Sequence, residues 1–335
     1  MNINAGIIGT GYGRYVILES LKKIKYIKKI IINGRNKPLI EKLNKNRQVS
    51  EAYSSLNVFL KKKDISLLCI ATVPIKQFQI LNRIKKKQYN FFFLEKPIAN
   101  NHKNIIKIYN KFKSIKEKVA VDFIFLSLNS FRTFKSLIKN KKILNVNIKW
   151  HFKAHHYKNN IEDTWKKNPK LGGGIYYFYI IHMISYINFF FGRITKVIEK
   201  NEVQINSQDI FGVFLDLECS KNLRINMDFN SNSNKNIHEI EVVTKRRIFK
   251  LEKRSKDHVN NFIITKFDNN KILLKKITFK KNHSNKDTRI EPVKNILNNL
   301  LKNRKPTSSI YDAYLASNDL EKIVKASTSK ISFLK

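Results

Sequence analysis

The sequence predicts an α/β protein with two domains: a doubly wound parallel sheet, then an α+β domain with an open, mainly antiparallel sheet and helices. Three observations predict it. Apolar strands alternate with helices through the first 120 or so residues, these strands are continuous apolar runs, and the later strands form a meander. The 335 residues can bury two cores. We expect domains at 1–123 and 124–335, with the last helices free to pack back on the first.

The first domain is expected to contain a strand before each helix. Its strands are predicted at Ala5–Ile8, Lys29–Ile32, Ser66–Ala71, Asn90–Leu94 and Val119–Ile124. Its helices are predicted at Tyr15–Ile24, Pro38–Asn44, Ile75–Lys87 and Lys103–Phe112. Strands that are apolar at successive positions have both faces covered, which is typical of parallel sheets.

The second domain is expected to differ, because its strands follow one another with few helices between them. Strands are predicted at Asn145–Ala154, Lys196–Glu202, Ile210–Glu218, Leu223–Asn230, His238–Thr244, Arg247–Lys253 and Lys271–Phe279. Helices are predicted at Ile175–Phe190, Glu291–Leu301 and Ile310–Ser327. Consecutive strands joined by short turns favour antiparallel pairing.

The net charge of +41 suggests a nucleic-acid or anionic-membrane protein at first sight. The lysines, however, are spread from end to end together with Asn and Ile, as AT-rich coding would produce. A nucleic-acid site would concentrate basic and aromatic residues on one element. We therefore expect no specific nucleic-acid partner, and only weak attraction of anionic substrates.

The two cysteines and the termini indicate a cytoplasmic protein. Cys69 and Cys219 show no metal-type spacing, and no disulfide framework or metal site is expected. The first strand starts within a few residues of Met1, leaving no room for a signal peptide. The apolar stretch Ile175–Phe191 is interrupted by His182 and other polar residues at a three-residue spacing, so it predicts a buried helix with one polar face rather than a membrane span.

A glycine-rich turn, Gly9-Thr10-Gly11-Tyr12-Gly13-Arg14, joins the first strand to the first helix. Gly9 allows a tight turn, Gly11 lets the backbone approach a pyrophosphate, and the helix start offers free N–H groups to the anion. Arg14 stands where this pattern usually has Gly or Ala, and Gly13 is available for close helix–strand packing. The turn predicts a dinucleotide site.

The end of the second strand bears on the choice of dinucleotide. An acidic residue there would bind the ribose 2′-hydroxyl of NAD, and none is present. Arg35 and Lys37 suit a 2′-phosphate instead. NADP(H) is therefore favoured, and NAD(H) remains possible because both residues could belong to the basic background.

Lys96 lies between Glu95 and Pro97 after the apolar strand FFFL. Ligands of open α/β sheets bind at the carboxyl ends of the strands. Burial beside a cationic nicotinamide would lower the lysine pKa toward a value useful in proton transfer. Glu95 could hold the ammonium group in place. The alternative is a surface lysine in a lysine-rich chain.

The block from Trp165 to Gly192 contains Gly172-Gly173-Gly174 and then His182 on a helix. The triple glycine predicts a flexible loop that brings a ligand close to the backbone. A lone histidine on an apolar helix is usually a core residue, but its position after the glycines favours a site role. Trp165, Gly173, Gly174 and His182 are the predicted substrate residues.

At this point the chain resembles the Gfo/Idh/MocA family of oxidoreductases, named for glucose–fructose oxidoreductase and inositol dehydrogenase. The matching segments are Gly6–Gly13, Cys69–Pro74, Leu94–Ala99, Trp165 with the triple glycine and His182, and the C-terminal stretch from Asn303. The resemblance implies a Rossmann domain, hydride transfer at a sugar or cyclitol carbon, and Lys96 and His182 at the reacting hydroxyl. It also implies an oligomer, a homodimer or homotetramer, formed through the open sheet.

The cofactor-binding set predicted from the turn and the resemblance lies at four strand ends. It comprises Gly9, Thr10, Gly11, Tyr12, Gly13, Arg14, Arg35, Ala71, Thr72, Pro74, Glu95, Lys96 and Pro97.

Three positions depart from the family pattern. Phe178 replaces an Asp common four residues before the histidine, Ser185 replaces a frequent Asp, and Gln77 replaces a histidine. Tyr179 lies on the same helical face as His182 and could supply a hydroxyl in place of the missing carboxylate. We therefore predict Lys96, His182 and Tyr179 as catalytic residues.

The resulting hypothesis is an NAD(P)-dependent oxidoreductase acting on a sugar or nucleotide-linked sugar. The basic charge, with Trp150, His155, His156 and Trp165, could frame a large anionic ligand. The alternative is a catalytically impaired dinucleotide-binding or regulatory protein, which the Phe178 substitution would favour.

Overall fold

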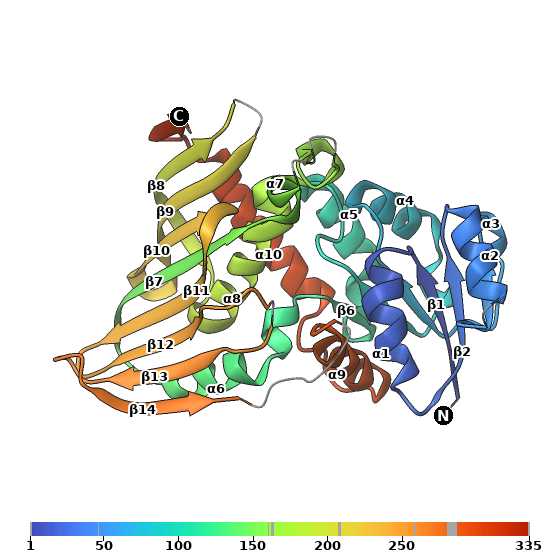
Figure 1. The fold of residues 1–335 in the computed structure, drawn as a ribbon, viewed down its shortest axis with the longest axis horizontal. Helices are drawn as coiled ribbons and strands as arrows, with labels where there is room; N and C mark the ends of the chain where they lie inside the picture. Colours follow the sequence, from blue (N-terminus) through green and yellow to red (C-terminus); the bar gives the residue numbers. More distant parts are fainter. Residues whose placement is uncertain are drawn as a thin grey trace. The chain divides into compact units, whose positions relative to one another are not determined.

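The computed structural model describes residues 2–45, 47–159, 161, 164–206, 209–257, 259–279 and 287–333 (Figure 1). The chain divides into two compact units, each built from two segments of sequence. The first unit combines Met1–Ser127 with Ser284–Tyr314, and the second combines Leu128–His283 with Leu315–Lys335.

The first unit contains a six-stranded sheet in which every neighbouring pair is parallel. The strands are β1 (Ile3–Ile8), β2 (Ile27–Asn33), β3 (Glu51–Tyr53), β4 (Leu67–Ile70), β5 (Phe91–Leu94) and β6 (Val119–Val121). Their spatial order is β3-β2-β1-β4-β5-β6, so the direction of winding reverses between β1 and β4. Ligands of such sheets bind at that reversal. The predicted doubly wound parallel sheet is confirmed.

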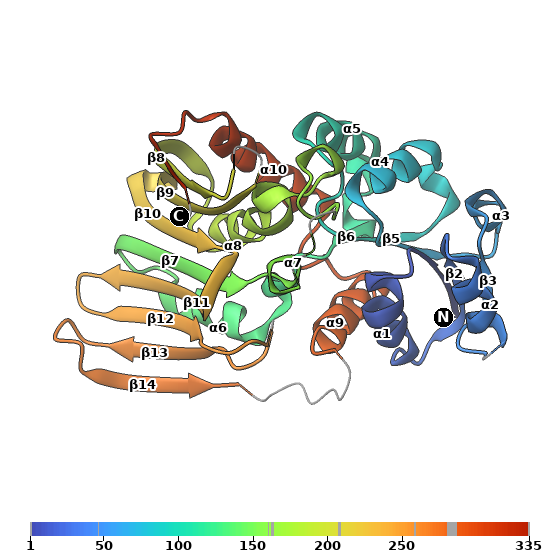
Figure 2. The same ribbon diagram turned by 45° about the horizontal axis from the view of Figure 1, so that its top comes forward.

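Helices cover both faces of this sheet, which is why β4 and β5 contain no polar positions. Every residue of β4 and β5 is buried. The helices are α1 (Glu19–Lys22) after a π-helical turn over Gly13–Leu18, α2 (Lys37–Lys45), α3 (Leu56–Leu60), α4 (Pro74–Arg83), α5 (His102–Phe112) and α9 (Ile290–Leu301). Figure 2 shows α1 and α9 on one side of the sheet and α4 and α5 on the other.

Local sequence signals set where several of these helices begin. The Ser55 side chain accepts a hydrogen bond from the Val58 amide at the start of α3, and the Asn101 side chain accepts one from the Asn104 amide at the start of α5. Pro74 is the first residue of α4, where its missing N–H costs nothing.

The second unit contains a nine-stranded sheet in the order β14-β13-β12-β11-β7-β10-β9-β8-β15. Its strands are β7 (Ile143–Lys153), β8 (Ile194–Gln204), β9 (Ile210–Cys219), β10 (Leu223–Asn230), β11 (Asn232–Thr244), β12 (Ile248–Lys253), β13 (Ile263–Phe267), β14 (Leu273–Thr278) and β15 (Lys330–Phe333). The β7–β10 and β8–β15 pairs are parallel, and the remaining neighbours are antiparallel. The predicted open, mainly antiparallel sheet with helices is confirmed.

One face of this sheet is covered by helices. The helices are α6 (Asn129–Ile138), α7 (His155–Lys158), α8 (Ile181–Phe191) after a π-helical turn over Tyr176–Ile180, and α10 (Ile310–Lys325). Trp150 on β7 stacks on His238 of β11 with ring centroids 4.8 Å apart, and Phe131 of α6 lies 5.6 Å from Tyr186 of α8. The opposite face carries ion pairs such as Lys149–Asp228 at 3.6 Å.

The structure corrects several predicted boundaries and adds elements. The strand predicted to reach Ile124 ends at Val121 and is followed by a 3₁₀ turn, Ile124–Ser127. The helix predicted from Tyr15 begins at Gly13, and the helix predicted to Lys87 ends at Arg83. The elements not predicted are β3, α3, α6, α7, β13 and β15. Most of these have three to five residues, too few for a periodic pattern to show.

The apolar stretch Ile175–Phe191 forms the π-helical turn Tyr176–Ile180 and then α8. Residues Ile181–Ile187 are all buried. In the part of the chain that the structure describes, no helix has both the length and the apolar character needed to cross a membrane.

Candidate functional site

The glycine-rich turn follows β1 and meets the end of β4. Gly9 has a φ of +113°, and a Cβ there would lie 2.1 Å from the carbonyl oxygen of Ala71. A Cβ on Gly11 would meet no heavy atom of the described residues within 4 Å. The turn is therefore closed on the side of β4 and open in front of Gly11, which is the arrangement that lets a pyrophosphate approach the backbone.

The helix after the turn is packed through Gly13. A Cβ on Gly13 would lie 2.9 Å from Ile7 Cγ2, so this glycine provides the close helix–strand contact, and Arg14 does not disturb it. The amides of Arg14 and Tyr15 donate to the Gly11 carbonyl at 3.1 and 3.2 Å. The helix begins at Gly13, two residues before the predicted start. These two N–H groups are therefore bonded within the turn and are not free to bind an anion.

The predicted residues after β4 lie beside the glycines. The Ala71 amide donates to the Ile8 carbonyl at 2.9 Å, which extends the β1–β4 pairing past the strand end. The methyl group of Thr72 lies 3.3 Å from where a Cβ of Gly9 would be, and Pro74 starts α4. These residues thus belong to the same sheet edge as the turn.

The end of β2 also reaches the turn. A Cβ on Gly34 would lie 2.3 Å from Thr10 Cγ2, so the two segments touch. Arg35 follows directly, and its side chain is exposed, as is that of Lys37. The contact of Arg35 with a 2′-phosphate stays a prediction, and its place next to Thr10 is suitable for it.

The Glu95-Lys96-Pro97 segment is held by Gln77. The side-chain amide of Gln77 donates to the carbonyl of Glu95 at 2.6 Å and to the carbonyl of Pro97 at 3.2 Å, and Gln77 is fully buried. The backbone is thus fixed on both sides of Lys96, across a cis Lys96–Pro97 peptide bond. Lys96 is only 6% exposed, which rules out the surface-lysine alternative.

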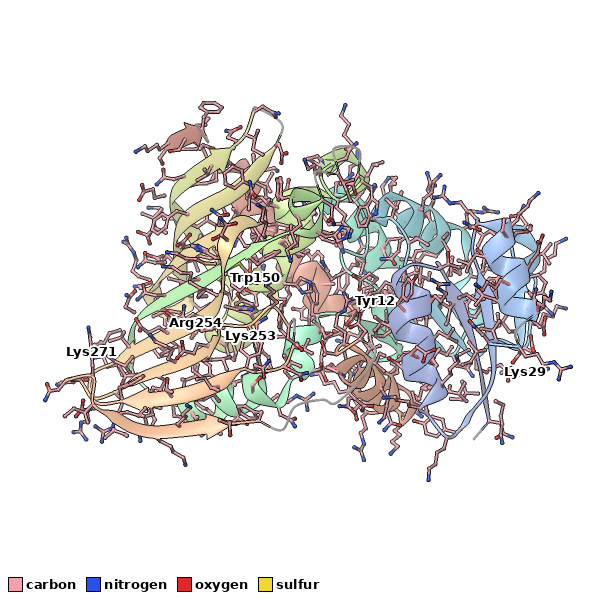
Figure 3. The ribbon with its side chains drawn as sticks, in the orientation of Figure 1. Tyr12, Lys29, Trp150, Lys253, Arg254 and Lys271 are labelled. Carbon is pink, nitrogen blue, oxygen red and sulfur yellow. The ribbon has the colours of Figure 1, made fainter. Side chains whose placement is uncertain are left out.

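A cluster of titratable side chains lies next to Lys96. The Tyr12 hydroxyl donates to Asp122 Oδ2 at 2.6 Å, and the Asp122 carboxyl also shares a hydrogen bond with Glu95. The Arg289 guanidinium lies 5.0 Å above the centroid of the Tyr12 ring. Figure 3 labels Tyr12 within the first unit. The cluster joins the ends of β5 and β6 to the glycine-rich turn.

Burial controls the charge of this cluster. Burial, and then the neighbouring Asp122 carboxylate, raise the pKa of Glu95 to about 8, although Lys96 and Arg289 act to lower it. Burial also raises the pKa of Asp122, against the hydrogen bonds from Tyr12 and Glu95. Two carboxyl groups this close cannot both ionise without penalty, so at neutral pH the pair keeps a proton. Glu95 therefore does not act simply as an ionised counter-ion of Lys96, because it shares a proton with Asp122.

The predicted site residues of the second unit meet at Trp150. The Trp150 ring centroid lies 6.2 Å from the Tyr179 ring and 6.3 Å from the His182 ring, each in an edge-on arrangement (Figure 3 labels Trp150). Tyr179 and His182 thus share a helical face, although Tyr179 belongs to the π-helical turn and His182 to α8. His182 is 9% exposed, and burial raises the pKa of the Tyr179 hydroxyl. Their catalytic roles stay predictions.

The triple glycine is not an open loop for a ligand. A Cβ on Gly173 would lie 2.1 Å from the Trp165 carbonyl oxygen, and the Gly174 amide donates to the Lys166 carbonyl at 2.8 Å. What approaches Gly173 closely is the chain's own backbone, because the loop folds against the turn before it. The loop's flexibility stays a prediction, and Gly174, with a φ of +73°, lies beside a pocket together with Tyr179.

Phe178 stands at the position where the family commonly has an aspartate, and its ring makes aromatic contacts there. Its ring lies 5.4 Å from the Trp165 ring and 4.7 Å from the Tyr179 ring, both near perpendicular. Phe178 therefore fixes the packing of Tyr179 without contributing a polar group.

Sequence reasoning assigned no role to three residues of the first unit's site, which are Asp122, Gln77 and Arg289. Asp122 was hidden because the predicted strand ran past it, although it follows β6 at the same sheet edge as Lys96. Gln77 was noted only as a departure, and Arg289 lies far away in sequence with no motif around it. Among the described residues, no three His, Cys, Asp or Glu side chains are grouped so as to hold a metal ion.

Comparison with known proteins decides the family. Residues 3–123 match the oxidoreductase family, NAD-binding Rossmann fold, and residues 135–331 match the oxidoreductase family, C-terminal alpha/beta domain. The chain belongs to the Gfo/Idh/MocA oxidoreductase family. The resemblance inferred from the motifs is confirmed, and so is the NAD(P)-binding Rossmann domain.

Individual relatives are distant. An uncharacterized oxidoreductase of Synechocystis sp. is 21% identical over 195 residues, which are 57% of this chain and 52% of the relative. The chain thus spans about half the length of the curated relative it matches. A 3-ketoreductase from Actinomadura kijaniata, solved with NADP and TDP-benzene, is 11% identical with a TM-score of 0.80 over 100% of both chains. Levoglucosan dehydrogenase in complex with NADH is 13% identical, with a TM-score of 0.80 over 97% of this chain and 96% of that one. These structural likenesses show the fold alone.

Proposed function

We propose that this oxidoreductase transfers a hydride between NADP(H) or NAD(H) and a carbon of a sugar or nucleotide-linked sugar. The observation that carries the proposal is Lys96, buried at the end of β5 and fixed by Gln77 in the unit that holds the glycine-rich turn. The solved neighbours, one with a TDP-linked ligand and one a sugar dehydrogenase, support the substrate class.

The chain's own residues fit a dinucleotide. The open face of Gly11 and the closed side at Gly9 would receive the pyrophosphate, and Arg35 would meet a 2′-phosphate where one is present. The nicotinamide supplies the hydride donor or acceptor when bound. We assign to Lys96 the exchange of the hydroxyl proton of the substrate, with the nearby Glu95–Asp122 pair setting the local charge.

In the second unit we assign substrate positioning to His182 and Tyr179, supported by their shared contact with Trp150. His182 would accept or donate a hydrogen bond at a sugar hydroxyl, and the Tyr179 hydroxyl would donate one because its pKa is raised by burial. We also propose that the open face of the nine-stranded sheet joins copies into a homodimer or homotetramer.

A titration with NADPH and NADH, followed by nicotinamide fluorescence, is the first test. Binding supports the cofactor site, and the absence of binding by reduced and oxidised forms refutes it. Turnover is then measured on sugars and nucleotide sugars by nicotinamide absorbance. Lys96→Ala is expected to lower turnover by about 10²–10⁴-fold with cofactor binding kept, while exposed Lys103→Ala changes neither.

A dinucleotide-binding protein without catalysis is the second candidate. The aromatic packing of Phe178, which leaves no carboxylate at that position, favours it. Tight cofactor binding without turnover on the whole panel, in the wild type as in Lys96→Ala, would establish this candidate and refute the enzyme.

A further inference from the structure

A pocket lies within the second unit, between α7, the triple-glycine loop and the starts and ends of three strands. It is lined by residues from five segments of the sequence. They include His156, Tyr157, Lys166, Lys167, Tyr179 and Asp209. Tyr179 and Gly174 connect this pocket to the predicted catalytic and substrate residues, and the basic and acidic side chains of its walls have no assigned role.

We propose that this pocket binds an oxyanion, a carboxylate or phosphoryl group, carried by the substrate of the hydride transfer. That the ligand is the substrate of a hydride transfer rests on the proposed function. That the ligand carries an anionic group rests on the residues of the pocket. The inference goes further because it assigns a charged group to one end of the substrate and names the side chains that meet it.

The charges of the described lining residues favour an anion. Two lysines line the pocket, and the carboxylate among these residues is that of Asp209. Lys167 Nζ lies 3.0 Å from Asp209 Oδ2, and Asp209 also accepts a hydrogen bond from the Tyr157 hydroxyl. Lys166 lies on the same turn, with its ammonium 5.7 Å from the Phe178 ring centroid. Among the lining residues that the structure describes, positive side chains thus outnumber negative ones by one.

His156 provides the second, independent observation. It is 5% exposed, lines the pocket, and its Nδ1 is buried with no hydrogen-bond partner in the described parts of the chain. A buried polar atom without a partner costs free energy, typically about 1–3 kcal/mol, unless a ligand or water satisfies it. An oxyanion would accept a hydrogen bond from the N–H of this ring.

The protonation of His156 can report on the ligand. The charged or titratable groups around it are Lys167, Asp209, Lys166 and His155. Burial, and then Lys167, lower the pKa of His156 to about 4, so the ring is neutral at pH 7 in the empty pocket. An anion beside the ring would raise this pKa, whereas a neutral sugar in the same place would not.

Binding to the full chain is measured by calorimetry at fixed ionic strength with UDP-glucose, glucuronate, inorganic phosphate and glucose. The first two separate a phosphoryl source from a carboxylate source, and glucose is the neutral reference. We expect the anionic ligands to bind, and Lys166→Ala and Lys167→Ala to weaken their binding at least about tenfold each. Exposed Lys170→Ala, on the same loop but outside the lining, is the matched control and should change little.

Nuclear magnetic resonance titration of the His156 ring keeps the proposal testable if a lysine variant fails to fold. The His156 pKa should rise with UDP-glucose or glucuronate and stay unchanged with glucose. An equal loss in Lys170→Ala would show a general effect of the basic chain and overturn the proposal. Ligand binding or turnover that is indifferent to ligand charge and to both lysines would also overturn it, yet leave the proposed function standing. A wild-type protein that binds neither NADPH nor NADH would instead refute the proposed function.

Discussion

Replacing Glu95 with glutamine is expected to stabilise the protein increasingly as the pH rises. Below its ordinary value of 4.5 the Glu95 carboxyl is protonated in both the folded and the unfolded chain. Between 4.5 and about 8 the unfolded chain ionises while the folded chain keeps the proton, so the free energy of unfolding of the wild type falls. Glutamine has the shape of the protonated carboxyl and cannot ionise, so the variant escapes this loss.

The size of the effect follows from the raised pKa. Each pH unit between the two values is worth about 1.4 kcal/mol, so from pH 4.5 to pH 7 the variant should gain about 3 kcal/mol relative to wild type. This is an upper bound, since the side chain keeps some solvent contact. The stability gained by the variant is lowered further by Asp122. The proton is shared by the two carboxyl groups, so the pKa of Asp122 changes once residue 95 cannot ionise.

The assay is urea unfolding of wild type and Glu95→Gln at several values between pH 5 and pH 8, at constant salt. The difference between the two proteins cancels the pH dependence of the many other groups. Exposed Glu117→Gln in the same unit is the matched control and should give a difference that is flat with pH. A Glu95→Gln difference that is flat, or that shrinks as the pH rises, would refute the idea that burial outweighs Lys96 at this carboxyl.

Four further substitutions test the cofactor edge of the first unit. Gly9→Ala should lower the stability by about 3 kcal/mol or more in thermal unfolding, because its Cβ would meet the Ala71 carbonyl at 2.1 Å; Gly11→Ala should leave the melting temperature unchanged and weaken NADPH binding. Gln77→Leu should cost about 1–3 kcal/mol, because two buried carbonyls lose their donor, and should lower turnover more than cofactor affinity; equal effects on both would contradict a role in holding the lysine segment. Arg35→Ala should weaken NADPH binding about tenfold and leave NADH binding unchanged, and parallel losses would remove Arg35 as a phosphate contact.

The sequence was most predictive where a segment had one dominant pattern. The runs that became β4 and β5 are apolar at every position, so their burial and parallel pairing followed from composition alone. The three residues of β3 and the four of β15 carry no such pattern and form strands because a neighbouring strand offers an edge. The ten residues of α6 do have an amphipathic face, with Phe131 and Phe134 buried, although no helix was predicted there.

The candidate site was predictable only as far as motifs reach. The glycine-rich turn and Lys96 carry their chemistry in local sequence, so both could be placed at the sheet edge in advance. Asp122 and Arg289 act through space, and Arg289 is brought to Tyr12 by the return of the chain into the first unit. No local motif joins Glu95 to Asp122, or Tyr12 to Arg289, so the acid pair and its cation had to be seen in the structure.

The basic composition makes burial the useful test of which lysines have a role. A chain with 66 Lys and Arg residues places most of them in water, as Lys29 and Lys271 show (Figure 3). A coding bias supplies exposed lysines at almost no cost, whereas a buried ammonium must be compensated. Within the described residues, the buried lysines are Lys96, Lys200 and Lys253. Lys200 lies 3.7 Å from Glu202 and Lys253 donates to a backbone carbonyl, each within the second unit. Lys96 lies at the carboxyl end of β5, at the same sheet edge as the glycine-rich turn and the Glu95–Asp122 pair. Composition therefore cannot explain Lys96, and this is the physical reason to look for the chemistry there.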